Sequence, residues 1–233
     1  MRIAKFIANA GVCSRREAER LIEQGEVMVD GKVINSPALN INETNFIKVN
    51  GKSVTKIPRT RLWVYYKPVG LLTTHDDPQG RPTIFEELEG KLPRVISVGR
   101  LDLNSEGLLL LTNNGDLSRY FESPSNNLER VYKLRSYGRG SEISLNNKKI
   151  TIDGIIYNPK SIKCTKKGAT NSWYEVVLTE GKNREIRKIF EYFDLEVSRL
   201  IRTNFGEYSL GDMQPGEFKE VKIHENYSWE VQK

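Results

Sequence analysis

The four consecutive leucines at 108–111 constrain the fold of this chain more than any other feature of its sequence. An unbroken apolar run of this length indicates a strand buried on both faces, although periodicity alone does not distinguish it from a buried segment of helix. Runs rich in aromatic and β-branched residues, at 62–66, 95–98, 130–134 and 173–178, predict further strands. We therefore expect an α+β domain built on a mostly antiparallel sheet.

Two helices are expected in the same domain. Apolar residues repeat at i, i+3, i+4 and i+7 over 186–193, so one face of a helix there packs on the sheet. The segment 181–183 precedes this helix and places Lys182 on a strand-to-helix loop. Asp116 is expected to cap a short helix that ends before Ser123.

Residues 1–58 are predicted to form a small separate α/β domain, and residues 59–233 the larger one. Apolar spacing predicts a helix over 3–10, and Ser14 with Glu17 forms a capping box that opens a second helix. Two hairpins are expected next, because Asp-Gly and Asn-Gly are preferred pairs in two-residue turns. These pairs stand at 30–31 and 50–51.

The chain carries 36 Lys and Arg against 30 Asp and Glu, a formal net charge of +6. This balance suits a polyanionic partner and says nothing about the fold. The charged faces of the predicted helices are either solvated surface or surfaces that contact phosphates. The candidate RNA-binding residues on them are Lys5, Ser14, Arg15, Arg16, Arg20, Arg184 and Arg187.

Several classes of protein are not indicated by the sequence. No apolar run approaches the length of a membrane helix, and the N-terminus lacks the pattern of a signal peptide, so we expect a cytoplasmic protein with no membrane partner. Cys13 and Cys164 stand far apart and indicate neither a disulfide nor a zinc site. Phosphate-binding and dinucleotide-binding motifs are absent, and both histidines are isolated. We therefore expect a mechanism without cofactor or metal.

Asp102 stands in a loop bounded by Gly99 and Gly107, directly before the leucine run. Glycine permits backbone angles that other residues avoid, and Asp in such a loop often bonds its own backbone. The residues alone therefore allow either a structural turn or a catalytic carboxylate presented on a rigid strand.

Motifs along nearly the whole chain resemble those of a known enzyme family. Segment 14–19, with Gly25 and the segment 29–31, is similar to the RNA-binding domain of ribosomal protein S4. The Asp102 loop resembles the active-site motif of bacterial rRNA pseudouridine synthases of the RsuA/RluB branch. Further motifs of that branch match in the same order at 67–70, 77–83, 180–187 and 197–202, with Gly206. The resemblance implies an S4-like domain followed by a pseudouridine synthase domain.

The resemblance also implies the roles of individual residues. Asp102 is the catalytic carboxylate, acting either as nucleophile at C1′ or as base at C2′ of an extruded uridine. Lys182 is expected beside Asp102 and keeps it charged. Tyr132 stacks under the uracil and helps to remove the C5 proton. In the substrate pocket, Leu200 is a lining residue, and Arg100 contacts phosphate or fills the gap left by the base.

Three segments, at 77–83, 171–174 and 197–202, are closer to the RluB-like enzymes of large-subunit rRNA than to RsuA, while Ser105 occupies a position that is usually Thr. We predict a monomeric synthase that modifies 23S rRNA, free or in an assembling particle. Modification of 16S rRNA and a non-catalytic RNA-binding or ribosome-assembly factor remain alternatives. A glycoside- or nucleotide-hydrolysing enzyme would normally need a second carboxylate or a metal site.

Overall fold

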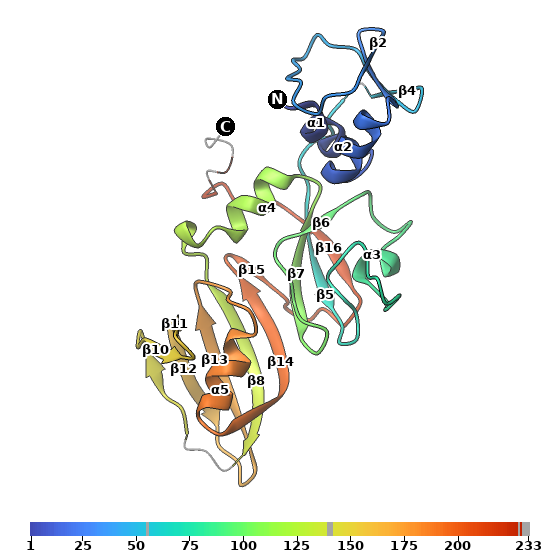
Figure 1. Cartoon of the computed structure of the whole chain (residues 1–233). Coiled ribbons are helices and arrows are strands. Elements are labelled where there is room, and N and C mark those ends of the chain that lie inside the picture. Colours follow the sequence, from blue (N-terminus) through green and yellow to red (C-terminus); the bar gives the residue numbers. More distant parts are fainter. Residues whose placement is uncertain (55, 139–141, 228, 230–233) are drawn as a thin grey trace.

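The computed structural model describes residues 1–54, 56–138, 142–227 and 229. A small N-terminal unit lies at one end of the molecule and is followed by a larger unit built on one long sheet (Figure 1). In the described part of the chain, no helix is long and apolar enough to cross a membrane.

The N-terminal unit packs two helices against a four-stranded antiparallel sheet of order β2-β1-β3-β4. Ile3 and Ile7 from the first helix, and Ala18 and Ile22 from the second, are buried against Val27 and its neighbours. The elements are α1 (Ile3–Asn9), α2 (Arg15–Glu23), β1 (Val27–Val29), β2 (Lys32–Ile34), β3 (Ile47–Val49) and β4 (Lys52–Val54).

Both predicted hairpins are confirmed. Asp30 and Asn50 adopt φ of 50° and 49°, and the glycine after each is also at positive φ, as a tight two-residue turn requires. Ser14 caps α2 as predicted, since its Oγ accepts the Glu17 N–H at 3.1 Å. The carboxylate of Glu17 does not complete the predicted capping box and instead accepts from Arg20 at 2.8 Å.

The larger unit contains, within the described residues, a ten-stranded sheet. Eight of its strands follow the path β16-β5-β7-β14-β8-β13-β12-β9. The other two lie off this path, where β6 pairs with β7 and β15 pairs with β14. The prediction of an α+β fold with a mostly antiparallel sheet is confirmed. The strands are β5 (Leu62–Lys67), β6 (Ile96–Ser97), β7 (Glu106–Thr112), β8 (Arg130–Gly138), β9 (Leu145–Asn146), β12 (Ser161–Lys166), β13 (Asn171–Leu178), β14 (Leu195–Phe205), β15 (Tyr208–Ser209) and β16 (Phe218–Val221). A separate hairpin joins β10 (Ile150–Ile152) and β11 (Ile155–Tyr157).

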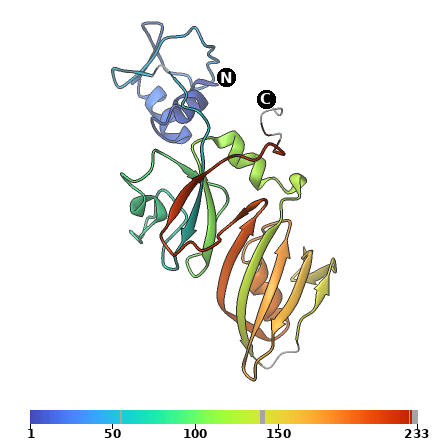
Figure 2. The same ribbon diagram turned by 180° about the vertical axis from the view of Figure 1, so that it is seen from behind.

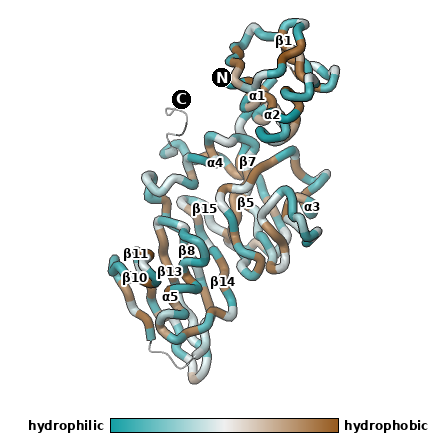
Figure 3. The backbone as a smooth tube through the Cα atoms, viewed as in Figure 1, coloured by the Kyte–Doolittle hydropathy of each residue, from teal (hydrophilic) through white to brown (hydrophobic). Residues whose placement is uncertain are grey.

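The leucine run forms most of β7, and every residue of that strand is buried. Leu109 and Leu111 point into one apolar cluster with the inner faces of β8 and β13, while Leu108 and Leu110 point into a second one. Hydrophobic residues accordingly concentrate in the strands (Figure 3). The strand is therefore covered on both faces, as its sequence predicts.

Helices cover the two sides of the sheet. α5 (Glu185–Tyr192) lies in front of β8, β13 and β14 in Figure 1 and behind them in Figure 2, with Ile186, Ile189 and Phe190 buried against the sheet. On the other side, α4 (Gly115–Glu122) packs against the second cluster through Leu117 and Phe121. Two short elements, α3 (Ile84–Glu87) and the 3₁₀ helix η1 (Pro124–Asn126), complete the unit.

The predicted cap of α4 was wrong by two residues. Asn114 is the N-cap, because its side-chain oxygen accepts the N–H groups of Asp116 at 2.8 Å and Leu117 at 3.4 Å. Asp116 lies within the first turn, where its charge still favours the positive end of the helix dipole. The end of this helix before Ser123 is as predicted.

β7 and β14 form a parallel pair, in which Ile201 lies opposite Glu106 and Arg202 opposite Gly107. The backbones approach so closely at this point that a Cβ on Gly107 would lie 2.3 Å from the Arg202 carbonyl oxygen. Gly107 also has φ of 108°, in the region that glycine tolerates and other residues avoid. This pair joins the β5–β7 half of the sheet to the β8–β13 half, and the candidate site lies where the halves meet.

Candidate functional site

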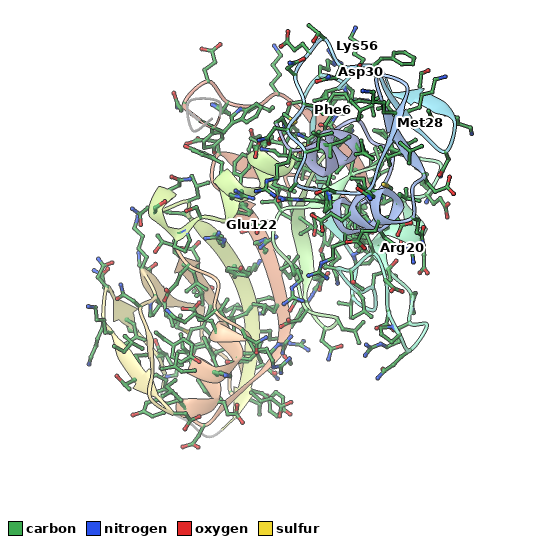
Figure 4. The ribbon with its side chains drawn as sticks, turned by 45° about the horizontal axis from the view of Figure 1, so that its top comes forward. Phe6, Arg20, Met28, Asp30, Lys56 and Glu122 are labelled. Carbon is green, nitrogen blue, oxygen red and sulfur yellow. The ribbon has the colours of Figure 1, made fainter. Side chains whose placement is uncertain are left out.

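Asp102 lies on the loop between β6 and β7, and 42% of its side chain is exposed. The loop begins at Gly99, which has φ of 66° and donates its N–H to the Glu122 carboxylate at the end of α4 (labelled in Figure 4) at 3.1 Å. It closes through Ser105, whose N–H donates to the Asp102 carbonyl at 3.0 Å. The backbone of the loop is therefore fixed while the carboxylate remains open to solvent.

Lys67 stabilises this loop by hydrogen bonds to its backbone. Its side chain is fully buried, and its ammonium donates to the carbonyls of Pro68 at 2.9 Å, Asp102 at 3.2 Å and Ser105 at 2.9 Å. Burial lowers the pKa of Lys67 to about 8, although the charges of Asp102 and Glu106 oppose this shift. Sequence reasoning gave Lys67 no role, and the available signal was a lysine that closes an otherwise aromatic and aliphatic strand.

Arg187 holds the same loop from the side. Its guanidinium donates from Nη2 to the Asn104 carbonyl and from Nη1 to the Val197 carbonyl on β14, both at 2.9 Å. Burial lowers the pKa of Arg187, and the neighbouring Arg184 acts in the same direction. The predicted placement of Arg187 on the solvent side of α5 was wrong, because this side chain crosses from the helix to the loop.

Among the described residues, Arg184 forms an ion pair with the carboxylate, with Nη1 at 3.9 Å from Asp102 Oδ2. The charge of Asp102 also acts on Arg187 and Lys67, where it opposes the lowering of their pKa values by burial. Arg184 is the N-cap of α5 and adopts φ of 49°, a conformation uncommon for residues other than glycine. The structure thus corrects the expectation for Lys182, whose ammonium pairs with Glu180 and lies 5.9 Å from the centre of the Tyr157 ring. Lys182 still borders the same cavity as Asp102.

A cavity of about 520 Å³ opens beside Asp102. Tyr132 from β8 and Leu200 from β14, both largely buried, line it together with Leu178 and Ile186. Arg100 lies exposed on its border. Of the residues selected from the sequence, the structure gathers around this cavity Asp102, Tyr132, Lys182, Arg100, Leu200, Arg184 and Arg187.

Two buried arginines, which sequence reasoning missed, also line the cavity. Arg130 donates to the carbonyls of Leu128 and Thr179, and Arg202 donates from Nε to the Leu108 carbonyl at 2.7 Å. Both guanidinium groups lie over the Phe205 ring, at 4.6 and 5.1 Å from its centre. Burial lowers the pKa of Arg130. Their hydrogen bonds to carbonyl oxygens leave positive charge in the cavity wall, which suits an anionic ligand.

The candidate RNA-binding residues of the N-terminal unit lie apart from this cavity. Lys5 reaches the larger unit, where its Nζ binds Asp116 at 2.8 Å. Arg15 and Arg20 pair with glutamates on their own helix, at 3.4 and 2.8 Å, while Arg16 is exposed (Arg20 is labelled in Figure 4). Ser14 is the cap of that helix. In the part of the chain that the structure describes, no group of three or more His, Cys, Asp or Glu is arranged to hold a metal ion.

A family model described as RNA pseudouridylate synthase matches residues 61–192, which is more than half of the chain. The chain belongs to this family. An S4 domain model matches residues 1–47. The resemblance that the motifs indicated is thus confirmed, both for the catalytic unit and for the N-terminal unit.

Individual relatives agree with the family. The chain is 60% identical over 222 residues to an uncharacterized RNA pseudouridine synthase of Rickettsia felis, covering 94% of this chain and 96% of that one. It is 40% identical to ribosomal large subunit pseudouridine synthase B of Salmonella typhi, over 90% of this chain and 75% of the relative. A crystal structure of a pseudouridylate synthase matches with a TM-score of 0.63 at 25% identity, over 95% of this chain and 96% of that one.

Proposed function

We propose that this chain converts specific uridines of large-subunit ribosomal RNA to pseudouridine, with Asp102 as the catalytic carboxylate. The observation that carries the proposal is a half-exposed carboxylate with a guanidinium at 3.9 Å, at the border of a cavity of about 520 Å³ lined by Tyr132 and Leu200. In the reaction the N1–C1′ bond breaks, the base turns, a C5–C1′ bond forms, and the C5 proton is lost while N1 gains one.

The position of Asp102 supports this role. A target uridine in paired or stacked RNA must be extruded to reach a pocket, and the cavity beside Asp102 would receive its base. The fixed loop would then present the carboxylate to the ribose, either as nucleophile at C1′ or as base at C2′. Arg184, at 3.9 Å, is proposed to orient the carboxylate through their opposite charges.

Tyr132 and Leu200 line the part of the cavity in which the uracil would lie. Both are largely buried, so their positions are fixed by the sheet. We assign stacking on the base and assistance in removal of the C5 proton to Tyr132, and shape selection to Leu200. Lys182 and the exposed Arg100 are assigned to the RNA strand that enters the cavity.

The substrate assignment rests on relatives and charge. The enzymes from Salmonella typhi and Pasteurella multocida, at 40% and 37% identity, are both named ribosomal large subunit pseudouridine synthase B. The exposed cations of α2 add a surface suited to RNA phosphates. We assign phosphate contacts to Arg15, Arg16 and Arg20, and to Lys5 if the RNA displaces Asp116 from its ammonium. Arg187, whose guanidinium is already bound by two carbonyls, is proposed to hold the Asp102 loop.

The test is carbodiimide and primer-extension mapping of pseudouridine on both large rRNAs. The RNA is taken from cells that lack the protein and from cells restored with wild type or with Asp102→Asn. A large-subunit signal that disappears, and that only wild type restores, would establish the reaction, the site and the carboxylate together. A missing small-subunit signal would keep the chemistry and overturn the choice of subunit. No missing signal would overturn the proposal.

We also propose that the chain acts as a monomer. Its large exposed apolar side chains are distributed over separate elements, for example Val33 on β2, Ile156 on β11 and Tyr192 on α5. Light scattering of the purified protein at concentrations used for catalysis tests this, and a dimer mass would contradict it.

A further inference from the structure

The turn between β13 and α5 carries two acidic side chains that the proposed mechanism does not use. Glu185, the first residue of α5, lines the active-site cavity and is only 3% exposed. Glu180, at the start of the turn, pairs with the ammonium of Lys182. The same turn delivers Arg184 to Asp102, so its conformation determines where that guanidinium lies.

If both carboxyl groups are ionised, one buried oxygen of Glu185 has no partner among the described residues. Glu185 Oε2 accepts the Lys182 N–H at 3.0 Å. Glu185 Oε1 is buried and accepts no hydrogen bond from the described residues. Glu180 Oε1 is also buried, and it is in ion-pair contact with the Lys182 ammonium. An ionised carboxylate can only accept. One proton held between the two carboxyl groups would give the buried Glu185 Oε1 a hydrogen-bond partner in Glu180, while Glu180 keeps its contact with the Lys182 ammonium.

The surroundings of Glu185 favour the protonated form of its carboxyl group. Burial raises the pKa of Glu185 to about 7, and the charge of Glu180 acts in the same direction, as does the hydrogen bond that a protonated Glu185 would donate to Glu180. The Lys182 N–H and the Lys182 charge oppose the shift. Arg130 from β8 also faces Glu185, whose charge opposes the lowering of the Arg130 pKa by burial.

The hydrogen bonds of Glu185 also shape the turn. Its carboxylate accepts the Lys182 N–H, and its own N–H donates to the Lys182 carbonyl at 3.2 Å. Between these two residues Arg184 is held at φ of 49°. Left-handed backbone at a residue other than glycine persists where neighbouring contacts hold it.

We propose that Glu180 and Glu185 share one proton, and that this carboxyl pair positions Lys182 and Arg184 at the active site. The sharing of the proton stands on the free protein alone, while its effect on turnover rests on the proposed function. Because the folded state holds this proton more tightly than the unfolded chain, the pair contributes its full stability below the usual pKa of 4.5. That contribution is lost as the pH rises through about 7.

The proton is tested by NMR of protein labelled with ¹³C at the glutamate carboxyl carbon. We expect the Glu185 resonance, assigned by its absence in Glu185→Gln, to titrate with a midpoint near 7. Glu180→Gln should lower that midpoint by about one unit, because a repelling charge is removed and an amide donor is supplied. A Glu185 midpoint below about 5.5, or a midpoint unchanged in Glu180→Gln, would overturn the shared proton.

Positioning is tested by single-turnover rates at saturating RNA. Glu185→Gln keeps an acceptor for Lys182 and a permanent donor for Glu180, so its rate should stay near wild type while its dependence on pH around 7 flattens. Glu185→Met removes both the acceptor for the Lys182 N–H and the donor to Glu180. It should lower the rate about tenfold or more, with RNA affinity retained. Glu191→Gln, on the exposed side of α5, is the control and should behave as wild type.

A wild-type pH profile in Glu185→Gln would overturn the positioning role, and so would a wild-type rate in Glu185→Met. A wild-type protein that forms no pseudouridine in rRNA would instead overturn the proposed function. The NMR result would then decide the proton pair separately.

Discussion

At the scale of single residues, the Asp102 carboxylate is expected to separate chemistry from binding. Asp102→Asn keeps the size and much of the polarity of the side chain but removes its charge, so it can act neither as nucleophile nor as base. We expect the single-turnover rate to fall by at least about 100-fold, the range of a lost general base or nucleophile. Affinity for the same RNA, measured by filter binding, should change little. Equal losses of rate and affinity would contradict this role.

Lys67 is expected to matter for the stability of the protein. In Lys67→Met a straight chain of similar volume remains, but three carbonyl groups, one of them in a fully buried hydrogen bond, lose their donor. Each orphaned group costs roughly 1–3 kcal/mol, so we expect a loss of about 3 kcal/mol in the free energy of unfolding, measured in urea. The exposed Lys219→Met on neighbouring β16 is the matched control and should stay within about 0.5 kcal/mol of wild type. Equal stabilities of the two variants would contradict the assignment.

At this scale, the sequence does not predict which groups a long side chain contacts. The position of Asp102 on a Gly-bounded loop before a buried strand was evident from local pattern. The destination of Arg187 was not, since its partners Asn104 and Val197 come from other elements. Arg184 reaches Asp102 because its own backbone is left-handed, a conformation that local propensity does not predict. The neighbouring Lys182, predicted as the cation beside the carboxylate, pairs with Glu180 instead.

At the scale of elements, the parallel pairing of β7 and β14 depends on Gly107. A Cβ there would lie 2.3 Å from one Arg202 backbone atom and 2.8 Å from another, and a side chain at φ of 108° adds strain. We expect Gly107→Ala to destabilise the protein by about 3 kcal/mol or more in urea unfolding. Gly115→Ala, at the start of α4, meets only a side chain at 3.9 Å and should be neutral or stabilising by about 0.5–1 kcal/mol. Similar effects of both substitutions would contradict the close approach.

Elements with a strong local pattern could be predicted from the sequence, and elements that depend on distant partners could not. The buried strand β7, the two Asn-Gly and Asp-Gly hairpins and α5 all follow from apolar periodicity or turn chemistry. The parallel pair of β7 and β14 joins segments more than 80 residues apart, with no local signal for their register. The α4 cap was misassigned because Asn114 and Asp116 are both good caps, and the structure uses the earlier one.

At the scale of the whole molecule, the N-terminal unit is expected to supply affinity rather than chemistry. Arg16 is exposed on α2, apart from the cavity. Arg16→Ala should therefore weaken RNA binding and reduce the slope of log affinity against log salt by about 1, with the single-turnover rate at saturating RNA unchanged. Lys52→Ala serves as control, because it also removes one positive charge but does so on β4 and not on the two helices. An unchanged slope in Arg16→Ala would contradict a phosphate contact.

The two units are joined by a short segment between β4 and β5, and Lys5 bridges them through Asp116. If both units contact the RNA as proposed, the second contact forms at the high effective concentration that the short connection sets. Each unit can then bind weakly on its own and still give a tight complex. The enzyme can release a modified rRNA by losing one contact at a time, without having to break a single strong interface.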